Sequence, residues 1–282
     1  VLIAQGVDYF ALVFGIAKVG AVSVPINPRF KARELKHVIS NSDMTALVAS
    51  DNLLEMPDPL DMLEEALPSL ASAMEPELHL AEAPLLRHIV IDGDSSRDWA
   101  SDYVSMLEGG GSTPDELVLS RSASVAIRDT AIIMYTSGTT ANPKGVMLPH
   151  EALVRHGFTI AETRFELTED DRVWSALPLH HIGGMAFFFT CLAAGATYCH
   201  TANFDPGRSI EQLQDEGCTI AIPIFETIWL AVLNHPDFEQ ADFSKLRIIH
   251  LLGVAERLAQ MQAVLPQAIQ VSSYGATECS SF

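Results

Sequence analysis

Basic residues are scarce in this chain. Lysine and arginine together number 17, against 36 aspartate and glutamate residues, and the formal net charge is −19 at pH 7. The excess is local, because residues 51–120 hold 16 acidic and 2 basic side chains. A nucleic-acid partner is bound through lysine and arginine, so this composition argues against one. The acidic stretch is typical of a solvated, non-catalytic region.

Cysteine is sparse as well. The four cysteines are Cys191, Cys199, Cys218 and Cys279. They form no Cys-x-x-Cys pair and have no histidine at zinc spacing, so we expect reduced thiols in the core of a cytoplasmic protein.

Long hydrophobic runs are missing too. The longest apolar stretches, 1–24 and 185–196, are broken by polar residues or are too short for a bilayer, so we expect no membrane span. The first stretch lacks the basic leader of a signal peptide. Because the chain begins at Val1, without methionine and within an apolar pattern, we expect a fragment of a longer protein.

Apolar runs alternate with helical patterns along the chain. Strands are predicted at 21–25, 44–49, 87–92, 131–134, 173–177, 196–199, 219–222, 247–252 and 269–272. Helices are predicted around residues 35–39 and at 7–19, 150–164, 185–194, 209–216, 225–233 and 256–264, with Trp174 and Trp229 in the core. This order predicts an α/β fold with parallel or mixed sheets flanked by helices. We expect two subdomains: 1–120, with an acidic variable region at 51–120, and 121–282.

Residues 135–150 carry a first candidate site. They read Tyr-Thr-Ser-Gly-Thr-Thr-Ala-Asn-Pro-Lys-Gly-Val-Met-Leu-Pro-His and follow a predicted buried strand. Hydroxyl groups, backbone N–H groups freed by glycine and the charge of Lys144 would suit a polyphosphate; the residues concerned are Thr136, Ser137, Gly138, Thr139, Thr140 and Gly145. A P-loop differs, because its lysine is followed by Ser or Thr and opens a helix. A plain Ser/Thr-rich surface loop is the simpler alternative.

A second candidate site follows the last predicted strand. Residues 274–278 read Tyr-Gly-Ala-Thr-Glu. An aromatic ring can cover a base, a hydroxyl can meet a phosphate and a carboxylate can hold Mg²⁺, so Tyr274, Gly275, Thr277 and Glu278 suit a nucleotide. The alternative is a strand-ending turn with a capping threonine. Ligands of open α/β sheets gather at this carboxyl edge.

Together the two stretches resemble the signatures of the adenylate-forming superfamily, which includes acyl-CoA synthetases, peptide adenylation domains and luciferases. The usual phosphate loop ends Thr-Gly-x-Pro-Lys-Gly, and Ala141 stands here in place of that glycine. The resemblance implies that Lys144 and the loop hydroxyls hold the β- and γ-phosphates of ATP. It assigns Tyr274 to adenine, Thr277 to the α-phosphate and Glu278 to magnesium.

Two further segments resemble acyl-CoA synthetases in particular. Residues 178–183 read Pro-Leu-His-His-Ile-Gly, where His180 replaces an aromatic residue and His181 matches the histidine of the acyl and pantetheine tunnel. Residues 253–256 read Gly-Val-Ala-Glu, and the resemblance places Gly253 and Ala255 beside adenine and the acyl group. An apolar acid is expected, because phenylalanines rather than an aspartate follow His181, and its pocket would draw on Phe187, Phe188, Ile224 and Val254.

The resemblance implies an AMP-forming acid–CoA ligase of fatty acid metabolism that uses ATP, magnesium and coenzyme A. The family's ribose-binding motif and mobile C-terminal domain do not occur within these 282 residues, so we expect no useful turnover from this piece alone. Two other functions stay open: a non-catalytic nucleotide-binding or interaction module, and another adenylate-forming enzyme such as a peptide adenylation domain.

Overall fold

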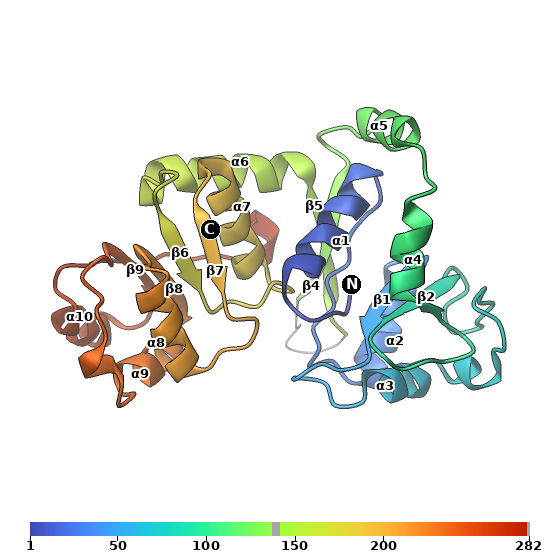
Figure 1. The fold of residues 1–282 in the computed structure, drawn as a ribbon, viewed down its shortest axis with the longest axis horizontal. Helices are drawn as coiled ribbons and strands as arrows, with labels where there is room; N and C mark the ends of the chain where they lie inside the picture. Colours follow the sequence, from blue (N-terminus) through green and yellow to red (C-terminus); the bar gives the residue numbers. More distant parts are fainter. Residues whose placement is uncertain (137–141, 281–282) are drawn as a thin grey trace. The chain divides into compact units, whose positions relative to one another are not determined.

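The computed structural model describes residues 1–136 and 142–280. Contacts divide the chain into two compact units, Val1–His150 and Glu151–Phe282, which are described separately below (Figure 1). A subdomain boundary near residue 120 stays a prediction. Within the described residues, no helix is both long enough and apolar enough to cross a bilayer.

The first unit contains a three-stranded parallel sheet in the order β1-β2-β3. The strands are β1 (Ala46–Ser50), β2 (His88–Asp92) and β3 (Ser101–Asp102). The helical elements are α1 (Val7–Lys18), α2 (Ala32–Asn41), α3 (Pro59–Ala66), the short turn η1 (Pro68–Ser72), α4 (Tyr103–Gly110) and α5 (Asp115–Ala123). The predicted helix at 7–19 and the strands at 44–49 and 87–92 are therefore confirmed.

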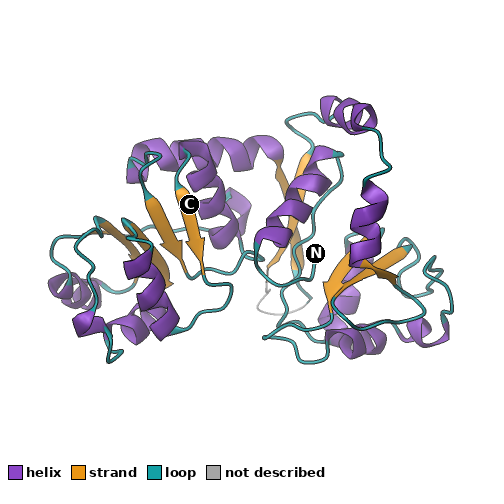
Figure 2. Cartoon of the chain, in the orientation of Figure 1, coloured by secondary structure: helices purple, strands orange, loops and turns teal. Residues whose placement is uncertain are grey.

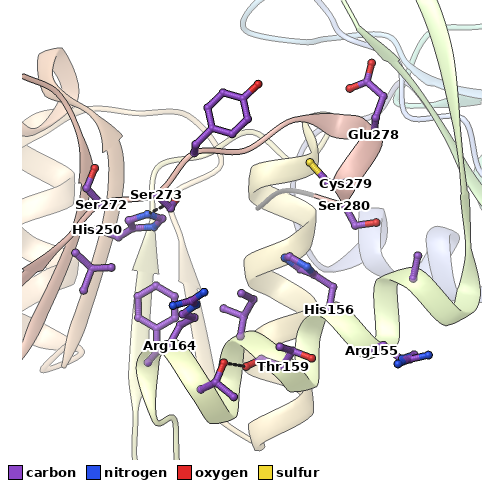
Figure 3. A pocket seen from close by; sticks show the side chains of 16 residues that line it. Arg155, His156, Thr159, Arg164, His250, Ser272, Ser273, Glu278, Cys279 and Ser280 are labelled. Carbon is purple, nitrogen blue, oxygen red and sulfur yellow. Dashed lines mark hydrogen bonds between the residues drawn. The ribbon is translucent and has the colours of Figure 1, made fainter.

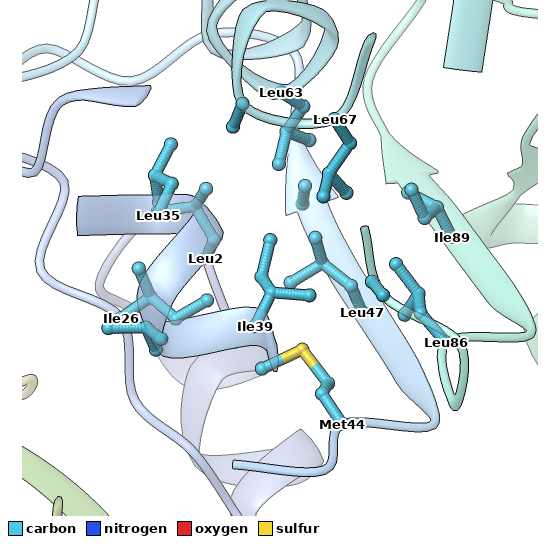
Figure 4. Packing of buried hydrophobic residues seen from close by; sticks show 14 of the residues in the cluster. Leu2, Ile26, Leu35, Ile39, Met44, Leu47, Leu63, Leu67, Leu86 and Ile89 are labelled. Carbon is cyan, nitrogen blue, oxygen red and sulfur yellow. The ribbon is translucent and has the colours of Figure 1, made fainter. Parts of the chain in front are cut away.

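Leucine side chains fill the core of this unit. Leu35 and Ile39 of α2 pack in the same cluster as Leu47 of β1 (Figure 4). Leu63 and Leu86, both from the acidic stretch 51–120, join this cluster with no more than trace exposure. That stretch is therefore more than a solvated region: its acidic residues lie among apolar positions that help to close the core.

An antiparallel hairpin completes the first unit. Its strands are β4 (Thr130–Thr136) and β5 (Lys144–Pro149). The hydroxyl of Tyr135 donates a 2.8 Å hydrogen bond to Asn41 at the end of α2. The sequence did not predict β5. The predicted strand at 21–25 is also wrong, because this segment forms only an isolated bridge between Ser23 and Ile132.

The second unit is a five-stranded parallel sheet in the order β10-β9-β8-β6-β7. Its strands are β6 (Arg172–Ser175), β7 (Thr197–His200), β8 (Ile220–Phe225), β9 (Ile248–Leu252) and β10 (Ile269–Val271). The longer helices are α6 (His150–Ile160), α7 (Ile182–Ala194), α8 (Pro206–Asp215), α9 (Glu226–Leu233) and α10 (Ala255–Val264). Short turns are η2 (Ala161–Phe165), η3 (Phe238–Gln240) and η4 (Thr277–Cys279).

Helices cover both faces of this sheet (Figure 2). Val173 and Ile220 point to the cluster that includes Phe187 of α7, whereas Trp174 points to the cluster that includes Trp229 of α9. This alternation is the period-2 pattern of a strand that is buried on both sides. Both tryptophans are fully buried, which confirms their predicted place in the core.

A closed polar network lies at the amino edge of the five-stranded sheet. Asp171, which directly precedes β6, accepts hydrogen bonds from Thr219 Oγ1 at 2.6 Å and from Arg247 Nη2 at 2.9 Å. Burial alone would raise the pKa of Asp171, but hydrogen bonds from Arg247 and Thr219 outweigh it and lower this pKa. Arg247 also donates to the carbonyl of Phe165 at 2.8 Å, which ties the turn η2 to the start of β9.

Candidate functional site

The carboxyl edge of the five-stranded sheet gathers several of the predicted site segments. β10 leads into residues 272–278, β9 leads into Gly253, and β6 leads into residues 178–181. Because all five strands are parallel, these segments leave the sheet at one edge. The fold thus brings the predicted adenine and magnesium motif to the same edge as the predicted tunnel histidine.

The side chains of the segment 272–280 are largely turned to solvent. Tyr274 keeps 86% of its surface exposed, although it is a large aromatic residue. Thr277 opens the turn η4, and Glu278 is exposed beside it. An aromatic ring, a hydroxyl and a carboxylate are therefore available to a ligand. Cys279 is exposed too, so its predicted place in the core is wrong: the turn η4 lies at the surface, whereas the other three cysteines are buried.

A cavity of about 700 Å³ lies beside this segment within the second unit (Figure 3). One wall is formed by α6 and η2, which contribute Ala152, Arg155, His156, Thr159, Ile160, Thr163, Arg164 and Phe165. The other side is formed by β9 and the segment after β10, which contribute His250, Val271, Ser272, Ser273, Tyr274, Glu278, Cys279 and Ser280. A cavity of this size is in the range of small-molecule sites.

His250 lies at the back of the cavity, and the sequence did not single it out. Its Nε2 atom and Ser273 Oγ are 2.8 Å apart and share a hydrogen bond. Its ring packs edge-on against Phe165 and Phe187, with centroids 5.7 and 5.5 Å away. Burial lowers the pKa of His250 to about 4, so the ring is neutral at pH 7. His250 thus fixes the residue next to Tyr274 without adding charge.

Charge in the cavity comes from α6, η2 and the 272–280 segment. Arg155 forms an ion pair with Glu151 at 2.9 Å, one helical turn earlier. Arg164 forms no ion pair with any residue that the structure describes, and Glu278 faces the cavity from the other wall. Burial lowers the pKa of His156, which favours its neutral form. The cavity therefore has one guanidinium without a carboxylate partner.

The predicted tunnel histidine lies away from this cavity. His181 stands at the N-cap position of α7 and is exposed, whereas its neighbour His180 is buried. The two rings lie with centroids 5.0 Å apart. A Cβ atom on Gly184 would approach the carbonyl oxygen of Pro178 to 2.4 Å, so only glycine lets α7 begin against this loop. Among the described residues that line the cavity, neither histidine occurs.

The predicted adenine-bordering residues follow β9. Gly253 lies at the strand end, and a Cβ atom there would come within 3.2 Å of Glu226 Oε2. Ala255 begins α10, and Val254 between them is 65% exposed. None of the predicted acid-pocket residues borders the described cavity; Phe187 and Ile224 are buried, Phe188 is half-buried and Val254 is in solvent.

The phosphate-loop residues belong to the first unit. Thr136 ends β4 and pairs with Lys144, the first residue of β5, and the Lys144 side chain is exposed. Ser137, Gly138, Thr139 and Thr140 lie outside the described residues. The chain after them is held by α2, because His37 Nε2 lies 2.9 Å from the carbonyl oxygen of Pro143. Lys144 therefore projects from a hairpin strand rather than from the start of a helix, as a P-loop would require.

Comparison with known proteins shows to which family this chain belongs. The sequence profile of the family described as AMP-binding enzyme matches residues 1–282. The chain belongs to the AMP-binding enzyme family. This match, the relatives and the solved structure described below together confirm the acyl-CoA synthetase resemblance and the fold expected from the sequence.

Individual relatives show how large a part of the longer proteins this chain matches. The YngI protein of Bacillus subtilis is 31% identical over 280 residues, which covers 97% of this chain and 50% of YngI. A 3-[(3aS,4S,7aS)-7a-methyl-1,5-dioxo-octahydro-1H-inden-4-yl]propanoyl:CoA ligase of Rhodococcus jostii is 30% identical over 269 residues, which covers 94% of this chain and 50% of the ligase. The chain spans about half the length of these curated relatives.

A solved structure agrees in fold. The anthranilate CoA ligase AuaEII in complex with anthranoyl-AMP matches with a TM-score of 0.79 at 21% identity, over 98% of this chain and 49% of that one. At this identity the likeness of the chain to AuaEII shows the fold alone.

The carboxylates at this sheet edge suit magnesium only if the substrate supplies further oxygen ligands. Among the described residues, no three histidine, cysteine, aspartate or glutamate side chains cluster as a metal site. Mg²⁺ is commonly held by one or two carboxylates together with substrate phosphates. The exposed carboxylate of Glu278 fits that arrangement, in which the ion arrives with the nucleotide.

Proposed function

We propose that this chain forms the ATP- and acid-binding part of an AMP-forming acid–CoA ligase. The observation that carries the proposal is the segment 272–280, where the exposed Tyr274 and Glu278 border a cavity large enough for an organic acid and the half-buried Thr277 directly precedes Glu278. Membership of the AMP-binding family supports the same function.

In this proposal ATP binds along the carboxyl edge of the five-stranded sheet. Tyr274 stacks on adenine and Gly275 lets the backbone approach it, while Gly253 and Ala255 border the same base. Thr277 binds the α-phosphate, and the Glu278 carboxylate would hold Mg²⁺, which would offset part of the phosphate charge. Lys144, Thr136 and the loop residues Ser137, Gly138, Thr139 and Thr140 bind the β- and γ-phosphates.

The acid binds in the cavity between α6 and the 272–280 segment. A carboxylate oxygen of the acid attacks the α-phosphorus, pyrophosphate leaves, and an acyl-adenylate forms; the thiol of coenzyme A then attacks the acyl carbon and AMP leaves. Bound magnesium would neutralise part of the phosphate charge. The chain's own task is to align the two reactants and to stabilise developing charge, and no side chain acts as nucleophile.

The second half-reaction needs an entry for coenzyme A. We propose that the exposed His181 at the start of α7 borders this entry, because it leaves the same sheet edge as Tyr274. The name of the Rhodococcus jostii relative describes a CoA ligase for a bicyclic propanoate. A cyclic or otherwise bulky acid is consistent with the cavity of about 700 Å³.

Calorimetry with MgATP tests the proposal. Glu278→Gln is expected to weaken MgATP binding about tenfold, because a charged metal ligand is lost, while AMP binding without magnesium stays unchanged. Glu211→Gln, on the exposed surface of α8, is the matched control and should bind like the wild type. Failure of the wild-type chain to bind MgATP, or equal binding by Glu278→Gln, would contradict the proposed function and favour a non-catalytic module.

A further inference from the structure

The cavity wall formed by α6 and η2 is largely polar and partly open to solvent. Residues of this wall include Arg155, His156, Thr159, Thr163 and Arg164, all of which border the cavity. Ala152, Ile160 and Phe165 are its apolar members. Arg155 is paired with Glu151, and Thr163 Oγ1 donates to the carbonyl oxygen of Thr159 at 2.7 Å. An acid with a purely apolar body would therefore leave the Arg164 guanidinium of this wall without a charged partner, which forgoes a favourable charge-assisted interaction.

The end of this wall has a special backbone geometry. η2 is a single π-helical turn, and Glu166 after it adopts a left-handed conformation with φ 46°. In a regular α-helix, three consecutive side chains point in directions about 100° apart and do not share one face. Here Thr163, Arg164 and Phe165 all border the cavity. Inserted π-turns of this kind occur often at functional sites.

The turn is also held in place from the sheet. Arg247 donates hydrogen bonds to the carbonyl oxygens of Phe165 at 2.8 Å and Glu166 at 3.2 Å. Arg247 is itself fixed by the buried carboxylate of Asp171. The position of Arg164 in the cavity wall therefore rests on a built network rather than on a loose helix end.

Arg164 and Glu278 lie on opposite sides of the cavity (Figure 3). Arg164 follows the carboxyl end of α6 and neighbours Phe165, which Arg247 ties to the amino edge of the sheet, whereas Glu278 follows β10 at the carboxyl edge. From Ala152 to Arg164 the wall extends roughly 18 Å at the rise of a helix. An elongated acid whose carboxylate reacts beside Glu278 would direct its other end toward Arg164.

We propose that the acid is bifunctional and carries a second carboxylate, which the Arg164 guanidinium binds at the end of the cavity remote from Glu278. This inference rests on the proposed function, and it names the class of acid. A guanidinium binds a carboxylate through paired, charge-assisted hydrogen bonds. Thr159 places a hydroxyl group on the same wall, one turn after His156, whereas the Thr163 hydroxyl donates to the carbonyl oxygen of Thr159 at 2.7 Å.

The neighbouring arginine is less suited to this task. Arg155 is already paired with Glu151, and its side chain is 78% exposed. A second carboxylate would have to compete with that ion pair. The structure thus favours Arg164 over Arg155 as the recognition residue.

Acyl-sulfamoyl adenosines, which mimic acyl-adenylates but cannot react, test the proposal by calorimetry on the 282-residue chain. Pairs of equal length, with about six to about twelve carbons to suit a wall of roughly 18 Å, would end in either a carboxylate or a methyl group. The carboxylate member of the best-fitting pair should bind about fivefold more tightly, a modest factor because Arg164 is exposed. The preference should shrink as salt is raised.

Substitutions test whether Arg164 causes the preference for the carboxylate-ended mimic. Arg164→Gln should abolish it, Arg164→Lys should keep part of it, and Arg208→Gln, an exposed arginine of α8, should leave it intact. Retention of the preference in Arg164→Gln, or equal binding of both mimics by the wild type, would overturn the proposal while nucleotide binding stands. If neither mimic nor adenosine sulfamate binds the wild type, the proposed function fails and this inference fails with it.

Discussion

The polar side chains at the two edges of the five-stranded sheet differ in burial and in hydrogen bonding. At the amino edge, Asp171, Thr219 and Arg247 satisfy one another, and Asp171 is only 5% exposed. At the carboxyl edge, Tyr274 is 86% exposed, and Glu278 lies in solvent beside a cavity. At the amino edge the polar side chains hydrogen-bond to one another and stabilise the fold. At the carboxyl edge the polar side chains remain available to bind a ligand.

The comparison separates stability from binding. Substitutions at the amino edge should lower the free energy of unfolding, because a partly buried charge loses its partners. Substitutions at the carboxyl edge should change ligand affinity and leave unfolding nearly unchanged, because exposed side chains contribute little to stability. His250 lies between these cases, since it is buried but touches the ligand-facing segment through Ser273.

The largest effect is expected from Asp171→Asn. Loss of the charge opposite Arg247 should lower the free energy of unfolding by about 3 kcal/mol, the lower part of the range for buried pairs because Arg247 is partly exposed. Urea unfolding followed by tryptophan fluorescence measures this, since Trp174 and Trp229 lie in the same unit. Asp215→Asn, on the exposed surface of α8, is the matched control. A loss no larger than that of the control would contradict the role of the amino edge.

The same carboxylate predicts a pH dependence. The pKa of Asp171 is lower in the folded chain than in the unfolded one, so its stabilisation is present above the unfolded pKa of about 4 and is lost as pH falls through the folded value. Asp171→Asn should therefore lack this acid-side part of the stability profile.

A smaller effect is expected from His250→Gln. Burial lowers the pKa of His250 to about 4, against about 6.5 in an unfolded chain, so protonation favours unfolding as pH falls from 6.5 to 4. The wild type should lose about 2 kcal/mol more than His250→Gln over this range, because glutamine does not titrate. His88→Gln, at an exposed position of β2, serves as the control. Parallel profiles for wild type and His250→Gln would show that the ring is not held neutral.

The smallest effect on stability is expected from Tyr274→Ala. The exposed ring makes little contribution to the core, so the free energy of unfolding should change by less than about 0.5 kcal/mol. Adenosine binding should weaken about fivefold, because a base loses its stacking surface. Tyr274→Phe should keep wild-type affinity. Unfolding of Tyr274→Ala at clearly lower urea, with adenosine affinity unchanged, would reverse the assignment of the two edges.

Much of the fold could be predicted from the sequence, because the strands of the second unit are short apolar runs between turn residues. Trp174 falls within such a run and Trp229 within the apolar helix α9, and both are in the core. The strand β5 was missed because Lys144, Gly145 and Pro149 make its sequence resemble a loop, and its partner β4 is what turns it into a strand. Such strand pairing depends on tertiary contacts, which the local sequence pattern does not reveal.

The motif residues of the candidate site could be predicted from the sequence, but the residues that form the cavity walls could not. Tyr274 and Glu278 stand out because their types and spacing suit a nucleotide. The polar wall of α6 does not stand out, because His156 and Thr159 would be ordinary on any solvated helix face, and only the packed structure places them against a cavity. His250 could not be predicted as a cavity residue, because a single histidine inside an apolar strand belongs to no recognisable motif.

Photolabelling with an 8-azido analogue of ATP tests the central claim most directly, because the reactive group sits on the adenine itself. The account predicts that magnesium-bound analogue labels the peptide containing Tyr274, that unlabelled ATP prevents this, and that Tyr274→Ala loses most of the label. Specific, ATP-competed labelling of a peptide that contains no residue of the carboxyl edge of the five-stranded sheet would contradict it.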